Sequence, residues 1–247
     1  MGARVLSSGL VAAAALGAPG PALAWPVDAA FDVVAGAERF ARPGTLDWVE
    51  VEDPKVATAE VLESGELLLS GVAPGRTLAL LHAEGQFVVW RLRVAAKGEK
   101  PKPVAGEAAM ASARKACPGL EAKAGAGEAQ LAGSIGDERC RQALLAVLET
   151  DAFLARELDL TFAMSALQGQ LLSLQAGLAG VGLKRLNSRY LGAGLELGGR
   201  VSAAEHRKAL WEVFRRSVGR VALDDQLEAA EEPPADAGTQ SSMRETP

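Results

Sequence analysis

The chain has 247 residues, of which 49% are hydrophobic, 23% are charged and 4% are aromatic. This is the composition of a folded protein with an aliphatic core, not of a disordered or fibrous chain. The formal net charge is -5, and residues 225–247 alone, with six acidic residues and one basic residue, account for it. That charge argues against a nucleic-acid partner. Two His and two Cys offer few metal ligands or nucleophile–base pairs, so the composition favours a binding or assembly protein over an enzyme.

Residues 1–24 have the pattern of a secretory signal peptide. Arg4 precedes an apolar run over 5–16, and Gly17–Pro21 separates that run from the small residues of Ala22-Leu23-Ala24. We therefore expect cleavage after Ala24 and a periplasmic location. A membrane anchor is the alternative, but the run is shorter than the roughly 20 residues that a span requires. The most apolar later stretch, residues 163–183, contains three Gln and is a poor span as well.

The two cysteines, Cys117 and Cys140, admit two interpretations. In an oxidising compartment a disulfide between them would close a short loop and contribute about 3 kcal/mol. Alternatively both are buried thiols, because Cys140 falls where a helix face requires an apolar residue. The sequence leaves both open.

Residues 25–94 show short alternating segments separated by turn signals. Phe31–Val34 and Asp47–Val51 alternate, and Asp53-Pro54 and Ala73-Pro74-Gly75 mark turns. Six or seven such strands predict a small β-sandwich. Residues 95–110, which contain Lys-Pro-Lys-Pro, are predicted to be a solvated linker.

An internal repeat follows the linker. Leu131-Ala-Gly-Ser-Ile135 matches Leu197-Gly-Gly-Arg-Val201 at an offset of 66 residues, and the match continues through the next apolar helical positions. Each copy is predicted to contain a strand, a polar turn and an amphipathic helix, with closing strands near 158–162 and 220–223 and a helix over 164–178. This predicts an α+β fold with modules at 111–162 and 163–227. The acidic segment from Glu228 is predicted to be disordered.

Several of these segments resemble a known family. Val49–Ala57 (VEVEDPKVA), Glu66–Gly71 (ELLLSG), Ala73–Thr77 (APGRT) and Glu84–Val94 (EGQFVVWRLRV) resemble the pilus-assembly N-terminal domain of type II/III secretion secretins, especially those of Tad pilus systems. The two later copies resemble BON-type modules, which are helix-strand-strand-helix-strand units that follow this domain in such secretins. The glycine-rich pore domain of those secretins has no counterpart in this sequence.

The resemblance implies a non-enzymatic, periplasmic accessory or scaffold protein of a pilus assembly or secretin-based secretion system. Its partners would be a secretin ring or other pilus and secretion components, and a homo-oligomer is left open. The alternative is a free-standing BON-like module that binds phospholipid or a cell-envelope polymer. No cofactor or metal is expected, because His82 and His206 have no acidic or Cys partner at ligand or catalytic spacing.

One charged region could serve either hypothesis. Residues 184–220 contain nine bases and three acids, and the strongest candidates for a basic face that binds a partner or lipid are Arg207, Lys208, Arg215, Arg216 and Arg220. The simpler interpretation is a solvated helix face. A further alternative is that the acidic segment after residue 224 binds this face within the same chain.

Overall fold

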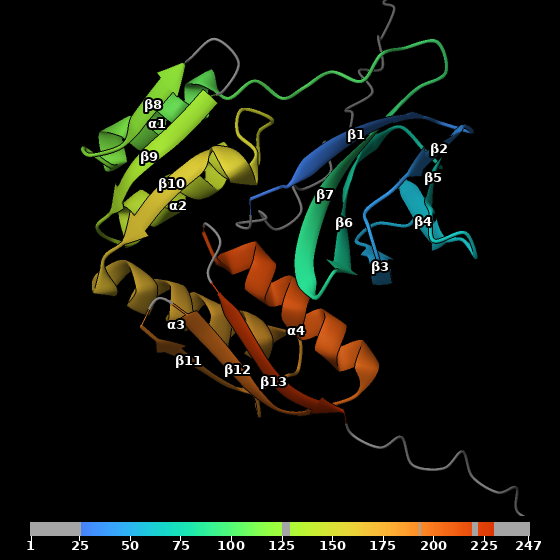
Figure 1. Ribbon diagram of the computed structural model, residues 1–247. Coiled ribbons are helices and arrows are strands. Elements are labelled where there is room, and N and C mark those ends of the chain that lie inside the picture. The colour runs from blue at the N-terminus through green and yellow to red at the C-terminus, as the bar shows by residue number, and fades with distance from the viewer. Residues whose placement is uncertain (1–25, 125–128, 193, 219–221, 230–247) are drawn as a thin grey trace, which may run out of the picture.

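The computed structural model describes residues 26–124, 129–192, 194–218 and 222–229 (Figure 1). The predicted signal peptide and the chain after Ala229 lie outside these residues. The described part is α+β, as predicted: a β-rich N-terminal domain precedes two smaller modules built from helices and sheets.

The N-terminal domain contains seven strands in two sheets. Their bounds are β1 (Ala29–Val34), β2 (Glu38–Ala41), β3 (Leu46–Val51), β4 (Ala57–Val61), β5 (Leu67–Gly71), β6 (Gly75–Ala83) and β7 (Gln86–Ala95). One sheet has the order β1-β7-β6-β3 and the other β2-β5-β4. Alternate residues such as Leu67 and Leu69 of β5 face inward, and Leu81 and Leu92 meet them from the larger sheet, so both sheets share one core.

Two of the turn motifs in this domain contact each other. The backbone N–H of Asp53 donates to the buried Thr77 Oγ1 at 2.9 Å, while the Asp53 carboxylate accepts from Lys55 N–H. A Cβ added to Gly75 would lie 3.2 Å from Val56, so glycine allows this close approach. The D-P-x-V segment and the P-G-x-T turn thus form one corner of the sandwich.

The two modules have the same element order. The first contains α1 (Glu107–Ala116), β8 (Glu121–Ala124), β9 (Ala129–Ile135), α2 (Glu138–Leu148), a short 3-10 helix (Ala155–Glu157) and β10 (Leu158–Phe162). The second contains α3 (Met164–Gly180), β11 (Asn187–Leu191), β12 (Gly194–Val201), α4 (Ala203–Arg216) and β13 (Leu223–Ala229). In each, the central strand pairs antiparallel with the strand before it and parallel with the strand after its helix. The repeat in the sequence is therefore a repeat of αββαβ topology.

The central strands of the two modules share a backbone feature. Gly133 in β9 and Gly199 in β12, which are equivalent in the repeat, have φ of 154° and 141°. A Cβ at Gly133 would lie 2.6 Å from the Gly119 carbonyl oxygen, and one at Gly199 would lie 2.7 Å from Leu186 Cδ2. Glycine in L-x-G-x-[IV] is thus required by backbone conformation in both copies.

The element bounds differ most from the prediction at two places. Helix α1 begins at Glu107, so the last residues of the predicted linker are helical. Strand β13 begins at Leu223, where the predicted strand ends, and continues through Glu228 and Ala229, which were predicted to be disordered. Its inward positions are Leu223, Asp225 and Leu227, and the inward-facing Asp225 is paired with His206. This carboxylate interrupts the alternation of apolar residues, so the hydrophobic pattern did not predict the full strand.

None of the helices in the described ranges has the length and hydropathy needed to cross a membrane. The helix within the apolar stretch at 163–183 is α3, which packs against its own module through Leu174 and Leu178.

Candidate interaction surfaces

Helix α4 lies between the N-terminal domain and the sheet of the second module (Figure 1). Ala209 and Val213 pack on its own sheet. Leu210, Trp211 and Phe214 pack instead against Leu80 and Val89 of the N-terminal domain. Burial of each such side chain contributes on the order of 1.5–3 kcal/mol, so this apolar contact holds the two units together.

The predicted basic face lies at this internal contact. Arg207 Nε is 3.0 Å from Glu50 Oε2, and Arg215 Nη2 is 2.8 Å from Glu52 Oε1, so both arginines pair with strand β3 and the loop after it. Arg215 and Arg216 also pair with Glu212. Three of the five predicted arginines and lysines therefore have carboxylate partners within the protein.

The other two members of that set have different positions. Lys208 lies on α4 with an exposed side chain. Arg220 falls outside the described residues. The structure thus does not show one continuous exposed basic face.

The first module contacts the N-terminal domain through a polar cluster. The buried guanidinium of Arg91 in β7 donates to the carbonyl oxygens of Leu148 and Thr150, at 2.9 and 2.6 Å, and to Asp151 Oδ1 at 2.8 Å. Asp151 also accepts from Val104 N–H at 2.6 Å. The Arg91 side chain thus satisfies carbonyls at the C-terminal end of α2 and fixes the loop that follows.

The pKa values in this cluster shift with burial and pairing. Burial lowers the pKa of the Arg91 guanidinium, although Asp151 opposes this shift. Burial alone would raise the pKa of Asp151, but the Val104 N–H and the Arg91 guanidinium outweigh it and lower the pKa. Asp151 is therefore held as a carboxylate.

Cys117 and Cys140 form a disulfide with an S–S distance of 2.05 Å. Cys117 is the C-cap residue of α1 and Cys140 lies in the first turn of α2, so the bond joins the two helices of the first module. Both cysteines are buried in the core of that module.

Both histidines have acidic partners that the sequence spacing did not reveal. His82 Nδ1 lies 2.7 Å from Asp47 Oδ2, and His206 Nε2 lies 2.6 Å from Asp225 Oδ2. Strand pairing brings the first pair together, since β3 is antiparallel to β6. In the described part of the chain, no cluster of three or more His, Cys, Asp or Glu could hold a metal ion.

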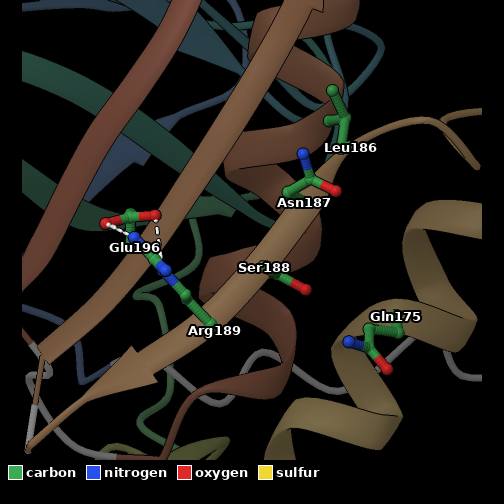
Figure 2. A pocket seen from close by; sticks show the side chains of 6 residues that line it. All are labelled: Gln175, Leu186, Asn187, Ser188, Arg189 and Glu196. Atoms are coloured by element: carbon green, nitrogen blue, oxygen red, sulfur yellow. Dashed lines mark hydrogen bonds and ion pairs between the residues drawn. The ribbon is translucent and has the colours of Figure 1, made fainter.

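A hollow of about 500 Å³ lies between α3 and strand β11 (Figure 2). Gln175 lines it from the helix and Leu186, Asn187 and Ser188 line it from the strand side. Arg189 and Glu196, which form a two-pronged ion pair at 2.7 and 2.9 Å, line it as well. This hollow adjoins an edge strand, because β11 is the first strand in the order β11-β12-β13.

Comparison with protein families accounts for the N-terminal domain. Residues 28–95 match the family model of the pilus formation protein N-terminal region. The match covers strands β1–β7 and confirms the resemblance of this domain. It ends before the two αββαβ modules, whose likeness to BON modules stays a prediction. Among curated proteins, none matches the sequence significantly.

Two solved structures show distant similarity. Domains 4 and 5 of the S-layer protein SbsC are 21% identical over 28% of this chain and 49% of that chain, with a TM-score of 0.23. CdsD, a structural protein of the type III secretion system of Chlamydia trachomatis, is 18% identical over 46% of this chain and 56% of that chain, with a TM-score of 0.26. The chain thus spans about half the length of each. These TM-scores are too low to support inference about fold or function.

The N-terminal domain has exposed apolar side chains on its smaller sheet. On the outer side of the sheet β2-β5-β4, Phe40 is 58% exposed and pairs across the strands with Leu68, whose other neighbour is Glu60. Val61, at the end of β4, is also exposed. Aromatic side chains are enriched in protein interfaces, so the outer side of this sheet is a candidate contact surface.

Proposed function

We propose that this protein is a cell-envelope accessory or scaffold component of a pilus assembly or secretin-based secretion system. The observation that carries the proposal is the match of residues 28–95 to the pilus formation N-terminal region. The protein would act in the periplasm by docking onto a secretin ring or another component of the same system.

The packing of the three units supports a scaffold role. The N-terminal domain contacts the second module through Leu80, Val89 and Phe214, and the first module through Arg91 and Asp151. Arg141 of α2 donates to the carbonyl oxygen of Arg216 at the end of α4, which links the two modules. Such contacts hold several surfaces in fixed relative positions, as simultaneous docking to more than one partner requires.

Binding to lipid or cell-envelope polymer is the second candidate. The predicted basic face would serve it, but Arg207 and Arg215 already pair with Glu50 and Glu52. These pairs reduce the positive charge available to an anionic surface. The protein-docking function is therefore favoured.

Crosslinking in the producing cell tests the proposal. A photoreactive residue in place of Phe40, on the outer face of the pilus formation region, should yield a covalent adduct with a pilus or secretion component. A photoreactive residue at the exposed Lys115 of α1 is the matched control and should give less of that adduct. Affinity purification that recovers no pilus or secretion component, together with no such adduct from Phe40, would refute the proposal.

Vesicle flotation tests the lipid alternative. Binding to vesicles containing anionic phospholipid that is lost in Lys208→Glu would favour the second function. Lys208 is the informative position because replacement of Arg215 would also break its contact with Glu52. Absence of flotation at low ionic strength, where electrostatic attraction is strongest, would remove this alternative.

A further inference from the structure

Strand β11 presents an open edge of the second module. It pairs with β12, antiparallel, and with no other strand of the described residues. An edge strand carries backbone N–H and C=O groups that can pair with another strand. Ser188, in the same strand, faces the same side as the buried Leu197, and its Oγ is buried without a hydrogen-bond partner in the described part of the chain. One of the residues that line the hollow between β11 and α3 (Figure 2), Ser188, therefore has a polar atom that the described residues leave without a hydrogen bond.

The helix above this edge has no charged residue. Met164, Gln168, Leu171 and Gln175 recur at steps of four, three and four residues, which places them on one flank of α3. Met164 is 61% exposed, and Leu172, beside this stripe, is 68% exposed.

This flank faces away from α4. Ser173 and Gly177, on the other side of α3, lie against Arg216 and Glu212 of α4. Gln175 lines the hollow at β11, so the uncharged flank lies on the side of the open edge (Figure 2). We name the combination of strand β11 and the α3 flank, with residues Met164, Gln168, Leu171, Leu172 and Gln175, the β11–α3 surface.

The charge pattern of this surface determines which partner it fits. A two-fold contact brings each residue near its own kind, so a surface with unpaired charges would repel its own copy. The α3 flank carries no charge, and Arg189, the central residue of β11, is neutralised by Glu196 of the same chain. A charged partner would find no unpaired charge on this surface, whereas a second copy would not be repelled by it. The charge pattern therefore favours a second copy of this chain.

We propose that two copies of the protein associate through the β11–α3 surface about a two-fold axis. Antiparallel pairing of β11 with its own copy, centred on Arg189, places Asn187 opposite Leu191 and Ser188 opposite Tyr190. The axis is perpendicular to the sheets, so the two α3 helices lie on the same face of one continuous sheet. Their uncharged flanks then pack against each other.

The alignment of α3 with β11 gives the helix contacts. Gln170 bonds to Tyr190, and Gln175 lines the hollow beside Ser188. Arg189 is therefore level with the helix near Leu172, within the segment between Gln170 and Gln175. An antiparallel crossing at this level sets Gln168 of one copy opposite Gln175 of the other, and Leu171 opposite Leu172.

Sedimentation equilibrium of the full chain, produced under conditions that allow disulfide formation, tests the proposal. A dimer of the unaltered protein should be detected as the protein concentration is raised to about 100 μM. The double variant Gln168→Glu/Gln175→Glu should weaken dimerisation at least about tenfold, because carboxylates would face each other across the axis. Gln168 and Gln175 are exposed, so the fold should be retained, and an unchanged melting temperature of the monomer checks this.

The double variant Gln168→Glu/Gln175→Lys is the matched control. It changes the same two positions, but each introduced carboxylate faces an introduced ammonium group of the other copy, so the dimer should persist. A monomeric unaltered chain would overturn the proposal. So would a Glu/Glu variant that dimerises as strongly as the unaltered protein, or a Glu/Lys variant as weak as the Glu/Glu variant. None of these outcomes depends on whether a pilus component is the partner.

Discussion

The two αββαβ modules differ in the interactions that dominate their contact with the N-terminal domain. The first uses charge and hydrogen bonds, through Arg91 and Asp151, and is crosslinked internally by Cys117–Cys140. The second buries Phe214 and its neighbours against the β-sandwich and has His206 at the position of Cys140. A duplicated topology therefore leaves the surface residues free to diverge, so that copies with equivalent cores attach differently.

The largest effect is expected from the apolar contact. Phe214→Ala should lower the free energy of unfolding by about 3–5 kcal/mol, since it removes a fully buried aromatic side chain. Denaturant unfolding gives this value, and hydrogen exchange should show lost protection in β6 and β7 as well as in α4. The matched position in the first module is Leu148, where Leu148→Ala should leave β6 better protected. Equal loss of protection in β6 from both variants would contradict the assignment of Phe214 to the domain contact.

Removal of the disulfide should destabilise the first module selectively. In the double variant Cys117→Ser/Cys140→Ser, the free energy of unfolding should fall by about 3 kcal/mol, because the bond spans 23 residues of chain and restricts the unfolded state. Hydrogen exchange should quicken in α1 and α2 while α3 changes less. Reductant added to this variant should cause no further change. Equal stability of the oxidised and variant proteins would show that the crosslink is dispensable.

The polar contact should respond to pH, unlike the apolar one. Asp151→Asn should lower the free energy of unfolding by about 2–3 kcal/mol at neutral pH. The variant leaves the buried Arg91 without its carboxylate partner, while the contacts of Arg91 with the two carbonyl oxygens remain. The folded pKa of Asp151 is lowered, so its contribution is fully present above the unfolded pKa of about 3.9 and is lost as the pH falls through the folded value. The difference between the two proteins should therefore shrink below about pH 4. A difference that stays constant down to strongly acidic pH would argue against this linkage.

Sequence patterns predicted the modules because hydrophobic periodicity is local. Strand Leu158–Phe162 and the start of α3 at Met164 lie where the pattern placed them. The disulfide remained open at the sequence level, since spacing does not give the Cα–Cα distance of 4.9 Å. The contacts of the basic residues were missed because their partners are distant in sequence: Arg207 pairs with Glu50, and no local pattern connects them.

The two equivalent glycines of the modules, Gly133 and Gly199, should differ in how much their replacement destabilises the protein. Gly133→Ala and Gly199→Ala each place a side chain at a positive φ, which costs about 1–3 kcal/mol. The Cβ at residue 133 would also meet the backbone oxygen of Gly119, whereas the one at residue 199 would meet the movable end of Leu186. Gly133→Ala should thus be the more destabilising of the two in thermal unfolding. The opposite order would mean that the backbone near Gly119 yields more easily than the Leu186 side chain.

The smallest effect concerns the ion pair that occupies part of the predicted basic face. Arg207→Gln should change the free energy of unfolding by less than about 1 kcal/mol, because the side chains of Arg207 and Glu50 are 44% and 35% exposed and water screens their attraction. Raised salt should reduce even this difference, while the cost of Phe214→Ala should not fall with it. A double-mutant cycle with Glu50→Gln isolates the coupling energy of the pair. A coupling as large as the cost of Phe214→Ala would mean that the second module is held to the N-terminal domain by charge, as the first is, and would remove the contrast between the two modules.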